Sequence, residues 1–144
     1  MRGSALSSND PLVSQEAVVI ERDAVPVMFK RVADEEAAIG HGIADVEAVI
    51  GPLRGRKCYG AFAAGEYRVC VQIREGADPA AIGLEVGELP GGRYARVRLK
   101  GSDLSRLIAP TFERLAQRPD RDASRPGIEF YRRHDVIDLL LPIV

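Results

Sequence analysis

The sequence has no tryptophan, only two cysteines, and no long uninterrupted run of apolar residues. Two cysteines cannot build the disulfide framework that supports small secreted domains. No apolar run approaches the roughly 18 residues that cross a bilayer, and no apolar segment typical of a signal peptide lies near the N-terminus. We therefore expect a reduced, cytoplasmic protein with no membrane partner.

An excess of charge of either sign is also missing. The net charge is −1 over 144 residues, with 28% charged and 46% hydrophobic residues. A chain this close to neutral has no overall field that attracts nucleic acid, so we expect no direct nucleic-acid binding. The length and composition are ordinary for one globular domain.

The N-terminal stretch "MRGSALSSNDPLVSQ" is polar and rich in serine. We predict that residues 1–16 form a flexible tail, in which "MRGS" resembles an expression leader. Residues 17–144 are then expected to form the single domain.

Apolar residues recur at helical spacing in two segments. The first stripe is Ile39, Ile43, Val46, Ile50 and Leu53, and the second is Leu104, Leu107, Ile108, Phe112 and Leu115. Gly51 and Pro52 are typical of a helix end, and Ser102 or Asp103 can cap the second helix. Pro110 falls inside the second segment, where it can kink the helix or shift its start.

Runs typical of strands surround the two helices. They are residues 17–21, 25–32, 57–62, 67–73, 84–89, 94–100, 128–134 and 136–143. The order strand, helix, strand, strand therefore occurs twice, at about 25–73 and 93–143. This pattern predicts an α+β fold built from a duplicated unit with pseudo-two-fold symmetry, in which antiparallel strands and two helices leave a central groove.

The two copies can be superposed through a Gly-x-x-x-Tyr pattern in their second strands. This places Lys57 on Glu129 and Tyr59 on Tyr131. Lys57 could then face Glu129 across the groove and neutralise it, or it could be an ordinary solvated lysine. Tyr59 and Tyr131 are expected to form walls of the groove.

Glu129 is unusual because glutamate is disfavoured in strands and costly to bury. It is either a functional carboxylate facing a groove, a solvent-facing residue, or an ion-pair partner of Lys57, Arg132 or Arg133. Strand alternation places Tyr131 on the same face as Glu129 and puts Phe130 on the other, where we expect it to pack under a helix.

Three motifs occur in a fixed order in the second half: "ELPGGRYARVRLKG", then after a helix "PGIEFY", then the closing strand "DLLLPI". Together they resemble the GyrI-like small-molecule-binding family, also called the bacterial transcription activator effector-binding domain. The resemblance covers roughly residues 17–144. It implies duplicated units of the SHS2 type and a groove that binds amphipathic or cationic aromatic compounds, as in multidrug binding. Glu129 and Tyr131 map onto groove residues of the family.

The chain departs from this family in two places. Many members carry an aromatic residue after the glycine aligned with Gly101, where this chain has Ser102 and Asp103, and many drug-binding members have a groove tryptophan. Both departures argue against a large, flat aromatic ligand.

The resemblance implies a binder of a small organic effector, acting alone or as the sensing part of a transcription regulator. The predicted ligand-binding residues are Glu129, Tyr131, Tyr59, Lys57, Tyr94 and Tyr67. An enzyme is the less favoured interpretation. In that case the chain would be a hydrolase of reactive natural products, with Glu129 as the base and Tyr131 polarising the leaving oxygen. A protein-binding module and a homodimer remain further alternatives.

No cofactor motif occurs, and the histidines and cysteines lack the spacing of a zinc site, so we predict no cofactor and no metal. Cys58 and Cys70 could lie opposite each other in a hairpin. In "RYARVRLK", Arg96, Arg98 and Lys100 share one strand face, which is either a basic ribbon or a solvated, ion-paired surface.

Overall fold

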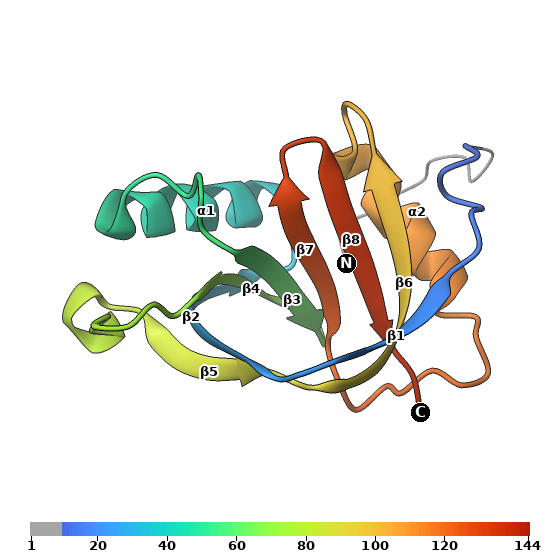
Figure 1. Cartoon of the computed structure of the whole chain (residues 1–144). Coiled ribbons are helices and arrows are strands. Elements are labelled where there is room, and N and C mark those ends of the chain that lie inside the picture. The colour runs from blue at the N-terminus through green and yellow to red at the C-terminus, as the bar shows by residue number, and fades with distance from the viewer. Residues whose placement is uncertain (1–9) are drawn as a thin grey trace.

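The computed structural model describes residues 10–144, and these form one curled antiparallel sheet of eight strands with two helices (Figure 1). The strands are β1 (Val18–Arg22), β2 (Val25–Ala33), β3 (Cys58–Ala63), β4 (Glu66–Gln72), β5 (Glu85–Leu89), β6 (Gly92–Lys100), β7 (Gly127–Arg133) and β8 (Val136–Pro142). The helices are α1 (Glu36–Ile50) and α2 (Ser105–Leu115), with a short 3₁₀ turn, η1, at Pro79–Ile82. The predicted α+β class and the order strand, helix, strand, strand are confirmed.

The strand order β1-β6-β8-β7-β3-β4-β2-β5 reads symmetrically about its centre. β3 and β7 pair in the middle of the sheet. Outward from β3 come β4, β2 and β5, and outward from β7 come β8, β6 and β1. In both directions the order is the last strand of the repeated unit, then its first strand, then one additional strand. Such an order is what two copies of one unit produce when they meet about a two-fold axis.

Both helices lie on the same side of the sheet, α1 beside β2 and β4 and α2 beside β8 (Figure 1). The apolar stripe of α1 buries Ile39 and Val46 against Val69 and Val71 of β4. The stripe of α2 buries Leu107 and its neighbours against alternate residues of β6 and β8. Burial of these side chains is the main stabilising contribution of each half.

The end of α1 agrees with the sequence prediction, whereas the start of α2 differs from it. α1 ends at Ile50 and is capped by Gly51, whose positive φ of 85° is one that glycine tolerates. α2 begins after Leu104 with no side-chain cap, so the predicted cap by Ser102 or Asp103 is wrong. Asp103 instead pairs with Arg106, the second residue of α2, at 3.5 Å. The helix continues through Pro110, which is buried.

Residues 10–16 do not behave as the loose tail that was expected, while residues 1–9 lie outside the described part of the chain. Val13 is fully buried against α2. Arg114 of α2 donates hydrogen bonds to the carbonyl oxygens of Val13 and Gln15. These contacts hold the segment against the second half of the molecule.

A disulfide between Cys58 and Cys70 is ruled out by strand register, and both are free. Cys70 pairs with Tyr59 rather than Cys58, so the two side chains lie on opposite faces of the sheet. Burial raises the pKa of the Cys70 thiol to about 12, and burial also raises the pKa of Cys58.

We predict that the Cys70 thiol resists alkylation in the folded protein, because the reactive thiolate is scarce at mildly alkaline pH and the side chain is buried. Mass spectrometry after iodoacetamide treatment should find Cys70 unmodified in buffer and fully modified in urea. Cys58, which is partly exposed, should react faster than Cys70. Equal rates at both thiols in buffer would contradict this assignment.

Candidate functional site

Glu129, in the central strand β7, is fully buried. Its Oε1 atom accepts a hydrogen bond from the hydroxyl of Tyr67, at 3.0 Å, and another from the hydroxyl of Tyr131. The two phenolic oxygens lie 3.4 Å apart. Because a carboxyl group loses hydration on burial, these hydrogen bonds are the compensation that keeps it inside the sheet. We call these three residues the Glu129 cluster.

The strand register explains why Tyr67 can reach Glu129 from β4. Gly60 of β3 lies directly opposite Glu129 and has no side chain to fill the space above it. A Cβ atom on Gly60 would lie 1.8 Å from the Tyr67 hydroxyl. The absence of a side chain at Gly60 therefore provides the room through which the phenol passes.

The cluster lies on the helix-bearing face of the sheet, between the two helices. Tyr67 packs in the core beneath α1, and Tyr131 contacts the core beneath α2. The site is thus assembled from both halves of the duplicated fold.

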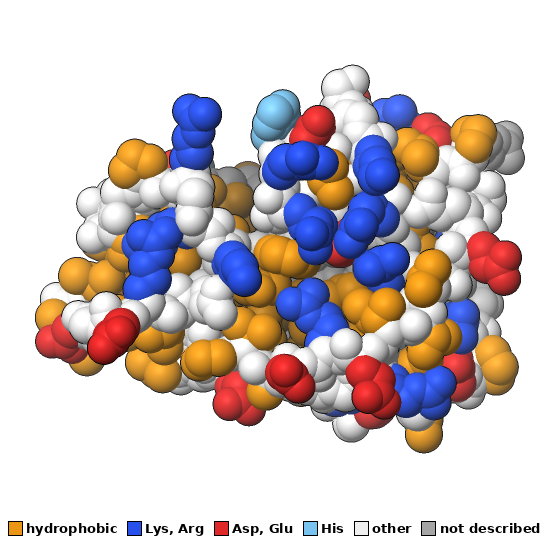
Figure 2. Space-filling model, viewed as in Figure 1, with side chains coloured by type: hydrophobic (Ala, Val, Ile, Leu, Met, Phe, Trp, Pro, Cys, Tyr) orange, Lys and Arg blue, Asp and Glu red, His pale blue; other side chains and the backbone are white. Residues whose placement is uncertain are grey.

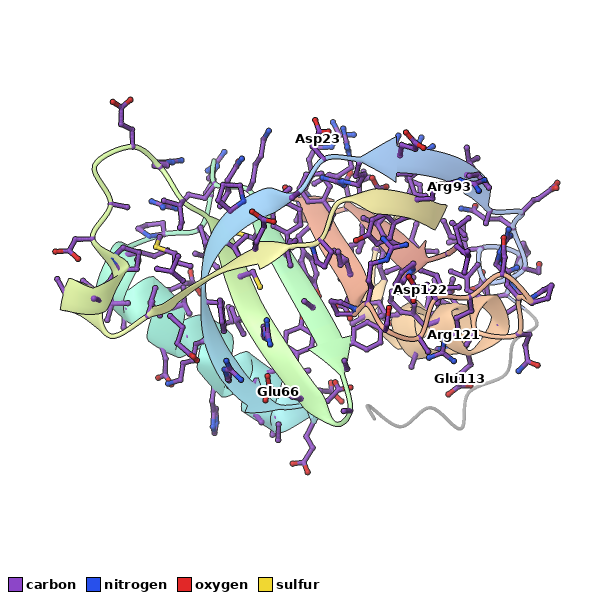
Figure 3. The ribbon with its side chains drawn as sticks, turned by 90° about the horizontal axis from the view of Figure 1, so that it is seen from below. Asp23, Glu66, Arg93, Glu113, Arg121 and Asp122 are labelled. Carbon is purple, nitrogen blue, oxygen red and sulfur yellow. The ribbon has the colours of Figure 1, made fainter. Side chains whose placement is uncertain are left out.

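A cavity of about 580 Å³ opens at the end of this face, between the β3–β4 turn and α2. Its apolar wall includes Phe62 and Phe112, which meet edge to face with centroids 4.7 Å apart. The charged residues that line it are Asp34, Glu113, Arg121, Asp122 and Arg125. Figure 3 shows the labelled Glu113, Arg121 and Asp122 close together at this end of the molecule.

Asp122 and Arg125 form an ion pair at 2.9 Å in the lining of the cavity. Hydrogen bonds from Ser124 and Arg125 lower the pKa of Asp122 to about 2, so this carboxylate is ionised at neutral pH. Arg125 also donates to the carbonyl oxygens of Gly91, Arg93 and Ile143. These bonds tie the loop before β7 to the start of β6 and the end of β8.

Phe62 lies between the cavity and the Glu129 cluster. Its ring covers Gly127, where a Cβ atom would lie 2.5 Å from the Phe62 Cζ atom. Gly127 precedes Glu129 by two residues and therefore faces the same side. Displacement of the Phe62 ring would extend the cavity toward Glu129.

The structure brings together three of the six predicted ligand-binding residues, Glu129, Tyr131 and Tyr67. The predicted common face of Glu129 and Tyr131 is confirmed by the pairing of β7. Tyr67 was predicted without a specific role, and its long side chain reaches Glu129 from the strand beyond β3.

Lys57 does not face Glu129, so of the two alternatives given for Lys57 the solvated lysine is the correct one. Glu129 pairs with Gly60, and Lys57 is an exposed residue just before β3. The Gly-x-x-x-Tyr superposition compared residue types only and did not consider strand register. It therefore suggested that Lys57 faces Glu129, which the pairing of β3 with β7 does not allow.

Tyr59 and Tyr94 also lie away from the Glu129 cluster. Tyr59 stacks on Phe130 with centroids 4.7 Å apart, in the core of the face opposite the helices. Tyr94 shares that core, and its hydroxyl donates to the Pro90 carbonyl at 2.5 Å. The expectations that Tyr59 walls the same groove as Tyr131, and that Phe130 packs under a helix, are therefore incorrect.

The sequence reasoning missed Phe62, Phe112 and Gly60. Phe62 lies two positions after Gly60 in a predicted strand, so alternation alone places them on one face. What alternation does not reveal is that this face is the one shared with Glu129.

Among residues 10–144 no cluster of three or more His, Cys, Asp or Glu side chains is arranged to hold a metal ion. No described helix could cross a membrane.

The fold is shared with solved structures of low sequence identity. An integron cassette protein from the mobile metagenome of Vibrio cholerae has a TM-score of 0.69 at 13% identity, covering 90% of this chain and 97% of that one. SAV2435 bound to tetraphenylphosphonium has a TM-score of 0.61 at 14% identity, covering 90% and 94%. A hydrolase from Listeria innocua has a TM-score of 0.53 at 11% identity, covering 90% and 92%.

No protein-family model matches the sequence, and neither does any curated protein. The curled eight-stranded sheet with two helices matches a GyrI-like fold. The comparisons therefore establish the class of fold, an α+β domain with one curled antiparallel sheet and two helices.

Proposed function

We propose that this protein binds a small amphipathic organic cation on the helix-bearing face of the sheet, with Glu129 as the group that recognises the positive charge. The observation that carries the proposal is a fully buried carboxyl group, held by two tyrosine hydroxyls, beside a cavity with aromatic walls. A carboxylate in a site of low polarity attracts a cation more strongly than one in water.

The dimensions and lining of the cavity suit this class of ligand. A volume of about 580 Å³ lies within the range of small-molecule sites, and Phe62 and Phe112 offer apolar contact and ring faces to a cation. Tetraphenylphosphonium, the ligand bound to SAV2435, belongs to the same chemical class. Entry to Glu129 requires the Phe62 ring to swing away from Gly127.

Ligand binding without catalysis is the activity of a stand-alone sensor or of a sequestering protein. The same site would serve equally well as the ligand-sensing part of a longer transcription regulator. Two free cysteines fit a reducing cytoplasm, where we place the protein.

Isothermal titration calorimetry with tetraphenylphosphonium, and with triphenylphosphine oxide as an uncharged control, tests the proposal. We expect saturable binding of the cation and at least tenfold weaker binding of the neutral compound. Glu129→Gln should weaken cation binding about 10- to 100-fold, or about 1.4–2.7 kcal/mol, because it removes the charge and keeps the side-chain shape. Glu47→Gln, on the exposed surface of α1, serves as the matched control and should leave the affinity unchanged.

Equal affinity of wild type and Glu129→Gln for tetraphenylphosphonium would overturn the role of Glu129. An absence of binding to any organic cation in a thermal-shift screen would overturn the function itself.

Hydrolysis is the second candidate, favoured by the shared fold of the Listeria hydrolase. Glu129 would act as the base toward water, and Tyr131 would polarise the leaving oxygen. Mass spectrometry of compounds recovered from the thermal-shift screen separates the two candidates. A binder returns its ligand unchanged, whereas a hydrolase returns products whose summed mass exceeds that of the compound by one water, and these products should be absent with Glu129→Gln.

A further inference from the structure

A second concave site lies on the opposite face of the sheet from the helices, and its chemistry is the reverse of the Glu129 cluster. Figure 2 shows lysine and arginine side chains gathered over the ends of β6, β7 and β8, while acidic side chains lie mainly toward the rim. The chain as a whole has a net charge of −1, so positive charge has been concentrated on this surface.

At this place the surface forms a hollow of about 390 Å³, which we call the basic hollow. Its lining residues are Arg56, Lys57, Arg98, Lys100, Phe130, Tyr131, Arg132, Arg133 and Val136. Six of these nine are cationic and none is acidic. Tyr131 is the one residue shared with the Glu129 cluster.

The strands place these cations together through their register. Arg98 of β6 pairs with Asp138 of β8, which in turn pairs with Phe130 of β7. These three side chains therefore share one face, which alternation assigns to the side away from the helices. Lys100 extends the same face of β6 by two residues.

Carboxylates neutralise only part of this charge. The buried Asp138 accepts two hydrogen bonds from Arg98, at 2.6 and 3.1 Å, and pairs with Arg132 at 3.5 Å. Asp135 lies 3.7 Å from Arg133. Two acidic residues, Asp138 and Asp135, therefore neutralise part of the charge of the six cationic residues that line the hollow.

The remaining cations have no such partner in the described part of the chain. Lys57 and Lys100 are exposed and form no ion pair with the residues of the range 10–144. The Nε atom of Arg56 is buried, and no described group accepts its hydrogen bond. A buried donor without an acceptor costs free energy, which a bound anion would recover.

We propose that the basic hollow binds a small polyanion that carries two or more phosphate groups. Several like charges that converge without compensation repel one another, and a ligand with charges of the opposite sign relieves this repulsion. Guanidinium and ammonium groups are the side chains that bind phosphate oxygens. The hollow is the size of a small-molecule site, and a nucleic-acid strand would need a basic track that continues beyond it.

Phe130 adds an apolar floor to the hollow, beneath Arg132, whose guanidinium carbon lies 5.4 Å from the ring centroid. Arg22 covers the same ring at 5.2 Å. A phosphate chain attached to an organic group could therefore contact both charge and apolar surface. This site does not depend on the function proposed for Glu129.

Titration calorimetry at low ionic strength with inorganic tripolyphosphate, ATP and an oligothymidylate tests the proposal. We expect saturable binding of tripolyphosphate with one site per chain, weakened by added salt as charge screening increases. ATP binding more tightly than tripolyphosphate would indicate that the organic group is also recognised, whereas equal affinity would assign recognition to the phosphates alone. Both results support the site.

The variant Lys57→Gln/Lys100→Gln removes two cations from the hollow without touching Asp138, and should weaken tripolyphosphate binding at least tenfold. The matched control is Lys30→Gln/Arg54→Gln, which removes the same net charge outside the hollow and should change the affinity less than twofold. Circular dichroism melts verify that both variants are folded.

Three results would overturn the proposal: no saturable binding of tripolyphosphate, equal losses in the two double variants, or an oligothymidylate that binds more tightly than either small ligand. The second result would mean nonspecific attraction, and the third would mean that the surface binds nucleic acid.

Discussion

Gly60→Ala is expected to lower the free energy of unfolding by about 3–5 kcal/mol, because it forces a methyl group into the space that Tyr67 occupies. The new Cβ atom would lie 1.8 Å from the Tyr67 hydroxyl oxygen and 2.3 Å from its Cζ atom. Tyr67 is almost fully buried and cannot swing into solvent without opening the core beneath α1. Overpacking and loss of the hydrogen bond to Glu129 therefore act together.

Urea denaturation measures this effect, and Gly40→Ala is its matched control. Gly40 lies in α1, and a Cβ atom added to it would meet no other atom within 4 Å, so alanine there should stabilise the helix by up to about 1 kcal/mol. Opposite signs for the same chemical change would show that the space at Gly60 is reserved for Tyr67. A change below about 1 kcal/mol for Gly60→Ala would contradict the packing described for this site.

Arg98→Met is expected to destabilise the fold by about 3 kcal/mol, because it removes the principal partner of the buried Asp138. Only 2% of the Asp138 side chain is exposed, and two hydrogen bonds from Arg98 compensate for its lost hydration. Arg132 lies farther away at 3.5 Å and replaces only part of that interaction, which keeps the loss at the lower end for a broken buried pair.

The double variant Arg98→Met/Asp138→Leu distinguishes a buried unpaired charge from a simple loss of packing. With both charges removed, no carboxylate remains buried without its main partner, so most of the stability should return. Denaturation of the wild type, both single variants and the double variant gives the coupling free energy. Additive losses would show that the two side chains contribute independently.

Local patterns in the sequence were sufficient to predict most of the elements. Both helices follow from apolar residues at steps of three and four, and all eight strands lie within or beside the predicted runs. The tight turns between β3 and β4 and between β7 and β8 follow from their polar and glycine-containing sequences. Each of these features depends on contacts between residues close in the chain, which is why composition and spacing reveal them.

The site was predicted only in part. Alternation correctly placed Glu129 with Tyr131, since two residues in one strand always share a face. The superposition of repeats wrongly placed Lys57 opposite Glu129 and Tyr59 in the same groove. Similar letter patterns do not define hydrogen-bonded register, and a shift of one residue moves a side chain to the other face of the sheet.

By itself, the sequence determined the helices, the strands, their repeated order and the common face of Glu129 and Tyr131. Only the tertiary structure decided that Tyr67, 62 residues away in the chain, donates to Glu129 through the space above Gly60. Only the structure gathered cations from β6, β7 and the segment before β3 into one hollow. The physical reason is that strand pairing and sheet curvature bring distant segments together, whereas periodicity describes only how neighbours along one segment are oriented.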